Sequence, residues 1–197
     1  MKTKILFLGR ADSPVFEWLQ KRGENALATE EKITTDFIEK NNFNFLISYG
    51  YRFILQKEIL DLFPNRAINM HISYLPYNRG ADPNFWSFIE GTPKGVSIHY
   101  LNEGVDTGDI IVQKEVLFDA LEVETLESSY HKLQKEIQNI FFKNWDLIKH
   151  QKCSRTTQAS IGTMHRVKDK EHLLFLIEKD GWNTTLSTLV NYGKSLK

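Results

Sequence analysis

KILFLG, residues 4 to 9, is a continuous apolar run closed by a glycine, the pattern of a strand buried on both faces of a parallel sheet. The same pattern returns along the first third of the chain, with segments of helical spacing between the runs. Strands that alternate with helices indicate βαβ units. We therefore expect an α/β, Rossmann-like fold with a mainly parallel sheet, whose further strands lie at residues 26–30, 43–50 and 66–72.

The pattern changes after these units. Two strand-like runs, at residues 95–101 and 109–118, are joined by NEGVDTG (102–108), whose glycines and carboxylates favour a loop. A long amphipathic helix is expected from Leu126 to Ile148. The composition then shifts to an extended connector, and residues 170–181 fit a helix or a strand equally well.

Composition and charge exclude several classes of function. Lys plus Arg and Asp plus Glu number 25 each, so the formal net charge is zero and no nucleic-acid polymer is expected as a partner. The single cysteine, Cys153, cannot form an intrachain disulfide or a cysteine metal cluster. The apolar run near the amino terminus is far shorter than a signal-peptide core, and no run approaches a membrane span. We expect a cytoplasmic protein that does not bind a membrane.

Asn69 and His71 stand two positions apart at the end of a predicted strand, so their side chains project to the same face. In open α/β sheets, ligands bind at this carboxyl edge. His99 and the loop with Asp106 and Asp109 follow other strand ends. An amide and an imidazolium can stabilise an oxyanion, and a carboxylate can orient the histidine and accept a proton. This set favours carbonyl chemistry, although a lone histidine more often satisfies a buried backbone group.

Two long runs, NMHISYLPYNRGADPNFWSFIEG (69–91) and GVSIHYLNEGVDTGDIIVQKEV (95–116), resemble the folate-dependent formyltransferases in motif, order and spacing. That family carries Asn-x-His, a serine two residues on, Leu-Pro and an Arg-Gly or Pro-Gly turn. Downstream it carries Gly-x-(Ser/Thr)-x-His and an Asp-Thr-Gly or Asp-Gly-Gly turn before a strand. The matching positions here are Asn69, His71, Ser73, Leu75, Pro76, Arg79, Gly80, Gly95, Ser97, His99, Asp106, Thr107 and Gly108.

The resemblance implies a fold of the formyltransferase type and transfer of a formyl group from 10-formyltetrahydrofolate to a primary amine, without a metal. It implies a catalytic domain at residues 1–150 and a C-terminal extension at 151–197, a hairpin or helix that contacts substrate or a second subunit. The catalytic residues would be Asn69, His71 and Asp106. The folate would lie against Ser48, Tyr49, Gly50, Tyr51, Phe53, Ile54, Gly104, Val105 and Asp106.

Alternatives stand beside these roles. Asp109 could supply the carboxylate, but it opens the next strand and fits a turn cap better. His99 could support the site from behind or simply pack in the core. The aromatic side chains Tyr49, Tyr51 and Phe53 could belong to the core rather than stack on the folate.

The acceptor amine is inferred by excluding other branches of the family. The segment after the first strand, GRADSPVFEW, lacks the phosphate loop that glycinamide ribonucleotide formyltransferases carry there, and the chain has no room for the basic second domain of methionyl-tRNA formyltransferases. YNRGADPNFW (77–86) and GTMHRVKDKE (162–171) are similar to the sugar N-formyltransferases. That branch implies a homodimer acting on a nucleotide-linked amino deoxysugar for surface polysaccharides, here a thymidine diphosphate 4-amino-4,6-dideoxyhexose. The substrate residues would be Tyr77, Asn78, Arg79, His165, Arg166 and Lys168.

Other interpretations remain at this point. The protein could formylate glycinamide ribonucleotide, hydrolyse 10-formyltetrahydrofolate, or bind folate without catalysis. Arg79 could hold its loop instead of touching substrate, and residues 162–171 could form a solvated, charged hairpin at a subunit contact.

Overall fold

The main sheet confirms the α/β prediction. The computed structural model describes residues 2–197, and within them the sheet has the strand order β2-β1-β3-β4-β6-β7. The pairs β1–β2, β1–β3 and β3–β4 all run parallel. The strands are β1 (Lys4–Leu8), β2 (Asn25–Thr29), β3 (Phe45–Ser48), β4 (Ala67–His71), β6 (Gly95–Tyr100) and β7 (Ile110–Glu115).

Two compact units, each drawn from three stretches of chain, make up the protein. The first unit contains Met1–His71, Ile98–Val112 and Gln138–Thr157, and the second contains Ile72–Ser97, Gln113–Ile137 and Gln158–Lys197. Both units therefore include parts of the expected 1–150 segment. The expected boundary at residue 150 stays a prediction.

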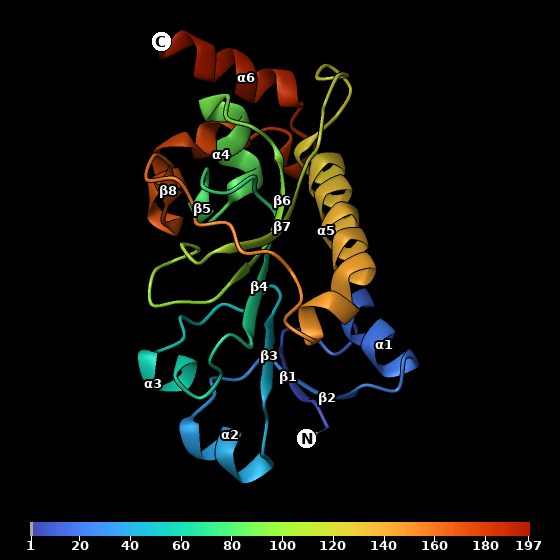
Figure 1. Ribbon diagram of the computed structural model, residues 1–197. Helices are drawn as coiled ribbons and strands as arrows, with labels where there is room; N and C mark the ends of the chain where they lie inside the picture. Colours follow the sequence, from blue (N-terminus) through green and yellow to red (C-terminus); the bar gives the residue numbers. More distant parts are fainter. Residues whose placement is uncertain (1) are drawn as a thin grey trace. The chain divides into compact units, whose positions relative to one another are not determined.

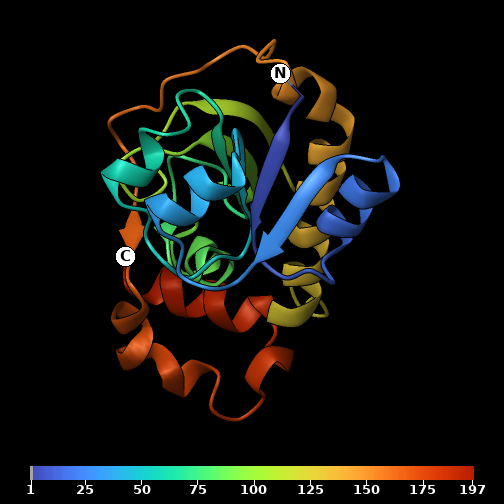
Figure 2. The same cartoon turned by 90° about the horizontal axis from the view of Figure 1, so that it is seen from below.

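In the first unit, alternating strand side chains fill two apolar layers. Leu6 and Leu46 pack on the side of α2 (Thr35–Asn41) and α3 (Lys57–Leu60). Phe7 and Phe45 point to the other side, where their rings lie 5.4 Å from those of Phe16 and Trp145. These partners belong to α1 (Pro14–Lys21) and α5 (Leu126–Lys149). Figures 1 and 2 show α2 and α1 on opposite sides of β1, so both faces of these strands are covered.

The helix ends of the first unit follow from local chemistry. Ser13 precedes α1 and caps it, since its Oγ accepts a hydrogen bond from the N–H of Phe16 at 3.3 Å. The helix α3 ends at Leu60. The N–H groups of Leu62 and Phe63 bond three residues back instead of four, which tightens the chain before Pro64. The predicted long helix is present as α5.

The second unit is built around α4 (Pro83–Glu90) and α6 (Leu186–Ser195). Figure 1 shows α6 lying across α4, and a side chain at Gly193 would collide with the backbone of Ile89, so this crossing requires a glycine. The apolar core of the second unit lies around these two helices and includes Phe85, Phe88, Leu173, Leu186 and Leu189. Residues 170–181, left open between helix and strand, lie in and after the 3-10 helix η1 (Val167–Leu176), and η2 (Gly181–Asn183) precedes α6.

A small second sheet ties the C-terminal segment into the second unit. β5 (Arg79–Gly80) pairs in parallel with β8 (Met164–His165). The N–H of Arg79 donates to Thr163 at 3.0 Å, and that of Ala81 donates to His165 at 2.8 Å. Because β8 pairs with a strand far away in the sequence, residues 162–171 do not form a hairpin.

Candidate active site

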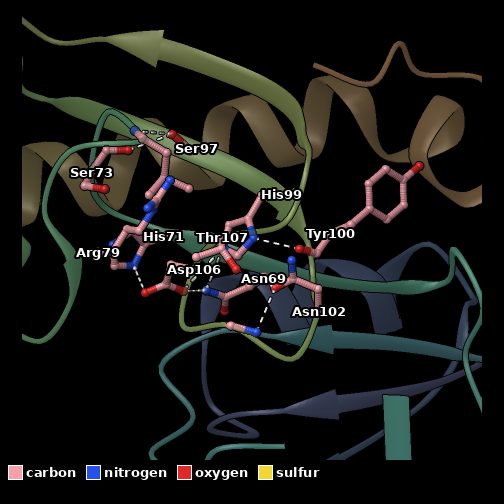
Figure 3. Close-up of polar contacts among 12 residues, drawn as sticks. Asn69, His71, Ser73, Arg79, Ser97, His99, Tyr100, Asn102, Asp106 and Thr107 are labelled. Atoms are coloured by element: carbon pink, nitrogen blue, oxygen red, sulfur yellow. Dashed lines mark hydrogen bonds and ion pairs between the residues drawn. The ribbon is translucent and has the colours of Figure 1, made fainter. Parts of the chain in front are cut away.

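Four polar side chains of the first unit meet at the carboxyl edge of the main sheet. Asn69 and His71 end β4, His99 lies near the end of β6, and Asp106 stands in the loop that follows β6 (Figure 3). Asn69 and His71 point the same way because strand side chains alternate. The structure therefore brings together the three residues that the resemblance implied as catalytic. Beside them it places His99, which the sequence left open between supporting the site and packing in the core.

The Asp106 carboxylate is the centre of this cluster. Its Oδ1 accepts a hydrogen bond from Asn69 Nδ2 at 3.1 Å and lies 3.4 Å from His99 Nε2. Its Oδ2 lies 3.7 Å from His71 Nδ1, an ion-pair distance when that ring is protonated. The Asp106 side chain is only 12% exposed. A buried carboxylate is costly without partners, and here an amide and two imidazoles supply them.

His99 is almost fully buried, and its ring is fixed in one orientation. Its Nδ1 lies 2.8 Å from the carbonyl oxygen of Tyr100, which can only accept, so Nδ1 carries a proton. Its Nε2 lies 3.2 Å from Asn69 Nδ2. His71 and His99 face each other edge to face, with ring centroids 6.4 Å apart. His99 thus contacts both Asn69 and Asp106 and does more than fill the core.

The loop that carries Asp106 is held by its own side chains. Asn102 Oδ1 accepts hydrogen bonds from the N–H of Gly104 at 3.2 Å and from Thr107 Oγ1 at 2.8 Å. Asp106 has the left-handed backbone φ of 52°, and a side chain at Gly108 would collide with the carbonyl of Tyr100. The loop is therefore shaped by local contacts of the free protein, and Asn102 is a residue that the motif did not single out.

Asp109, the alternative carboxylate, belongs to a different contact. Its Oδ2 pairs with Arg155 Nε at 3.2 Å, and the Arg155 guanidinium lies over the ring of Tyr100, 4.1 Å from the centroid. Arg155 also donates to Asn65 Oδ1 at 2.5 Å. The structure thus places Asp106 beside His71 and pairs Asp109 with an arginine.

The expected folate segments divide into packed and exposed side chains. Tyr49 accepts a hydrogen bond from Gln138 at 3.0 Å. Tyr51 packs on the core of the first unit and donates to the carbonyl of Glu31 at 2.8 Å, and burial raises the pKa of its phenol.

Other residues of the expected folate segments are more exposed: Ile54 is 70% and Val105 is 41% exposed. Ser48 ends β3 and is buried, Phe53 packs edge to face on Tyr51, and Gly50 and Gly104 are exposed. Contact of all these residues with folate stays a prediction.

The expected substrate residues of the turn after β4 are engaged with other protein groups. Asn78 is fully buried; its amide donates to Glu90 at 3.0 Å and accepts from Thr92 at 2.7 Å. Arg79 donates to Gln158 Oε1 through two nitrogens, at 3.0 and 2.7 Å. These contacts hold the turn. Binding of substrate by Tyr77, Asn78 and Arg79 stays a prediction.

The expected substrate residues of the C-terminal segment differ in exposure. His165 stacks on Trp86 with ring centroids 3.9 Å apart and lies 2.9 Å from a Glu90 oxygen. Arg166 and Lys168 are exposed. Their contact with a diphosphate stays a prediction.

Residues 2–197 also bear on membrane and metal binding. No helix in this range is both long and apolar enough to cross a membrane. In the same range, no group of three or more histidine, cysteine, aspartate or glutamate side chains is arranged to hold a metal ion.

Comparison with solved structures agrees with this geometry. The formyltransferase PseJ from Anoxybacillus kamchatkensis, in complex with UDP-4,6-dideoxy-4-formamido-L-AltNAc and tetrahydrofolate, is 43% identical with a TM-score of 0.90. That match covers 96% of this chain and 99% of the PseJ chain. A 4-N formyltransferase from Francisella tularensis is 22% identical with a TM-score of 0.74, over 87% of this chain and 79% of its own. The second likeness shows the fold alone.

Sequence comparisons agree at the level of the family. The methionyl-tRNA formyltransferase of Finegoldia magna is 38% identical over 85 residues, 43% of this chain and 27% of that protein. The match thus spans roughly a quarter of the length of such curated relatives. The family model described as Formyl transferase matches residues 6–144, well over half of the chain. These matches, together with the Asn69, His71 and Asp106 cluster, make the chain a member of the formyl transferase family.

Proposed function

We propose that the protein transfers the formyl group of 10-formyltetrahydrofolate to the 4-amino group of a uridine diphosphate-linked 4-amino-4,6-dideoxy sugar. The observation that carries the reaction class is the Asp106 carboxylate held between the Asn69 amide and two imidazoles. The substrate class is supported by PseJ, whose two ligands are a 4-formamido nucleotide sugar and tetrahydrofolate. Those two molecules are what formyl transfer to a 4-amine leaves behind.

The reaction needs an uncharged amine and a place for negative charge. The amine nitrogen attacks the formyl carbon, a new C–N bond forms, and the carbonyl electron pair moves onto oxygen. One Nδ2–H of Asn69, released from its contact with Asp106 or His99 as the substrate binds, and a protonated His71 stabilise this oxyanion. The carbonyl then re-forms as the bond from carbon to N10 of the folate breaks. The proton lost by the amine passes to Asp106 and, through water, to N10.

Positioning of Asp106 explains why this site suits such a transfer. The carboxylate faces His71 on one oxygen and Asn69 on the other, so it can accept a proton without leaving the two oxyanion donors. The Nδ1–H of His99 donates a hydrogen bond to the carbonyl of Tyr100, which keeps Nε2 toward Asp106 and Asn69. Catalysis then depends on groups that are in place before the substrates bind.

The nucleotide in this proposal is uridine diphosphate rather than the thymidine diphosphate expected from the motifs, because the relative of 43% identity carries a uridine nucleotide. The proposal also includes two further expectations. The protein forms a homodimer, and it works in the cytoplasm, which fits two substrates that are water-soluble anions. Light scattering of the purified protein measures the oligomeric state.

The test offers the purified protein 10-formyltetrahydrofolate with one amine at a time. We expect formylation of a uridine diphosphate 4-amino-4,6-dideoxy sugar, seen by mass spectrometry as the gain of one formyl group. Glycinamide ribonucleotide, a thymidine diphosphate 4-amino sugar and a reaction without amine are the comparison arms. Faster transfer to glycinamide ribonucleotide, or equal folate turnover without any amine, would contradict the proposal.

A further inference from the structure

Glu90, the last residue of α4, contacts both of the segments that the resemblance assigns to the nucleotide sugar. Its Oε2 accepts a hydrogen bond from Asn78 Nδ2 at 3.0 Å, and Asn78 belongs to the turn at residues 77–79. Its Oε1 lies 2.9 Å from Nε2 of His165 in β8, an ion-pair distance when that ring is protonated. The resemblance gives Glu90 itself no role, so its role has to follow from these contacts.

The two segments lie against each other along the backbone. β5 pairs in parallel with β8 (Figure 1), and the N–H of Asn78 donates to Thr163 Oγ1 at 2.9 Å. A side chain at Gly80 would collide with the carbonyl oxygen of His165, so the two backbones approach closely at this point. Residues 77–81 and 162–166, called the paired segments below, therefore share one backbone arrangement.

The pairing connects these segments with one ligand. Each of them resembles the sugar N-formyltransferases separately, although they are far apart in the sequence. In the structure Arg79 pairs with Met164, and the exposed cations Arg166 and Lys168 follow β8. Cations that are held in place before a diphosphate arrives bind it with less loss of side-chain freedom. The position of the paired segments therefore decides how well these cations can meet a diphosphate.

Helix α4 fixes the paired segments through two of its side chains. Trp86 and Glu90 are four residues apart on this helix, so both lie on the same face. The ring of Trp86 stacks on His165 with centroids 3.9 Å apart, while Glu90 faces Nε2 of the same ring. Asn78 is fully buried, and Thr92 Oγ1 donates to its Oδ1 at 2.7 Å. Glu90 therefore couples the turn to β8, one carboxylate oxygen for each.

Burial makes this carboxylate hard to replace by water. The side chains of Glu90 and His165 are 25% and 13% exposed. Loss of the carboxylate removes a charged acceptor from the buried Asn78 amide and a counter-charge from His165. We propose that Glu90 is a positioning residue: it fixes the paired segments, and with them Arg166 and Lys168, for the diphosphate of the nucleotide sugar without touching that substrate. This role rests on the proposed function.

Steady-state kinetics of Glu90→Ala, with a uridine diphosphate 4-amino-4,6-dideoxy sugar and 10-formyltetrahydrofolate, test this role. The KM of the sugar should rise at least roughly tenfold, the factor of one lost hydrogen bond to a charged group. Both kcat and the KM of the folate should change little, since no reacting group is removed. Glu90→Gln should recover part of the sugar affinity, because its amide oxygen still accepts from Asn78.

Two further variants separate positioning from a general loss of stability. Thr92→Val removes a second contact of the buried Asn78 amide and should raise the sugar KM by roughly 2- to 12-fold. The matched control is Glu124→Ala, which removes a 21% exposed glutamate of the same unit that pairs with Lys132 at 3.2 Å. This variant loses an ion pair of similar exposure outside the paired segments and should keep the sugar KM of the wild type.

A sugar KM that stays at the wild-type value in Thr92→Val, or in a folded Glu90→Ala, would overturn the positioning role while the wild type still formylates the sugar. An equal rise in the KM of both substrates, or a sugar KM in Glu124→Ala as high as in Glu90→Ala, would overturn it as well, since each indicates a structural role alone. A wild type that formylates no nucleotide-linked amino sugar would instead remove the proposed function, and the positioning role with it.

Discussion

His99 Nδ1 lies 2.8 Å from the carbonyl oxygen of Tyr100, and this contact determines which ring nitrogen faces the active site. The donor nitrogen is committed to the backbone, so Nε2 faces Asn69 and Asp106. When the ring is neutral, Nε2 accepts from the Asn69 amide and leaves Asp106 as the base. We therefore expect His99 to act as a positioning residue.

His99→Ala should lower kcat by roughly 5- to 150-fold, because one buried hydrogen-bond partner of Asn69 is lost. KM for both substrates should change little, since no ligand contact is removed. His99→Gln, which can still present a polar group, should recover part of the rate. Steady-state kinetics of the two variants provide the measurement. A rise in KM with unchanged kcat would place His99 in ligand binding instead.

His71 and Asp106 should behave as one unit. We expect His71→Ala and Asp106→Asn each to lose nearly as much turnover as the double variant, because either change removes the charged pair that the reaction uses. Single-turnover rates of the three variants measure this. If the rate losses of the two single variants instead multiply in the double variant, the two side chains act independently.

Asp109 and Asp106 form a matched pair of carboxylates in one loop. Asp106→Asn should lower kcat by at least about 100-fold, as expected for loss of a general base. Asp109→Asn should stay within about fivefold of the wild type, because its partly exposed pair with Arg155 is worth at most about 1 kcal/mol. Comparable losses in both variants would show that the Arg155 contact sets the loop geometry.

Glu24 should make the stability of the first unit depend on acid pH. Burial alone would raise the pKa of its carboxyl, but hydrogen bonds from Lys149 at 2.5 Å and Trp145 at 2.8 Å outweigh burial and leave the pKa below its ordinary value. The stabilisation of the folded state by ionised Glu24 is therefore complete above about pH 4.3, the pKa of a glutamate in the unfolded chain. It is lost as the pH falls through the lower pKa that Glu24 has in the folded protein.

Glu24→Gln should lower the free energy of unfolding at pH 7 by about 1.5 kcal/mol, the scale of a hydrogen bond to a charged group. The difference from the wild type should shrink as pH falls below about 4, because protonated glutamate resembles glutamine. Urea unfolding across this range measures it, with the exposed Glu17→Gln as the control. A difference that is constant with pH would rule out the charged contact as its source.

Much of the first unit could be predicted because its information is local. Continuous apolar runs predicted β1 and β3, and the spacing of Asn69 and His71 predicted that both side chains lie on one face of β4. The role of Asn102 could also have been predicted, since asparagine side chains commonly bond to the backbone of their own loop. The residue at which α3 ends could not be predicted, because Pro64 permits more than one way to leave a helix.

The second unit could not be predicted in the same way, because its contacts join segments that are far apart in the sequence. A cavity of this unit, for example, is lined by residues of the segments 82–85, 126–130 and 170–182, and no local sequence pattern predicts that these segments meet. Likewise Asn78, Arg79 and His165 looked available for substrate, while their partners Glu90, Gln158 and Trp86 are known only from tertiary packing. The role of His99 also depends on a loop that follows it in the chain.

The parallel pairing of β5 with β8 has a consequence for synthesis of the protein. Residues 79 and 164 are paired, so β5 emerges from the ribosome long before its partner exists. At translation rates of 5–20 residues per second, the delay is roughly 4 to 17 seconds. During that interval the backbone of β5 and the side chain of Arg79 lack their final partners. A nascent chain halted before residue 164 should therefore be more readily cleaved by protease near residue 79 than the released protein.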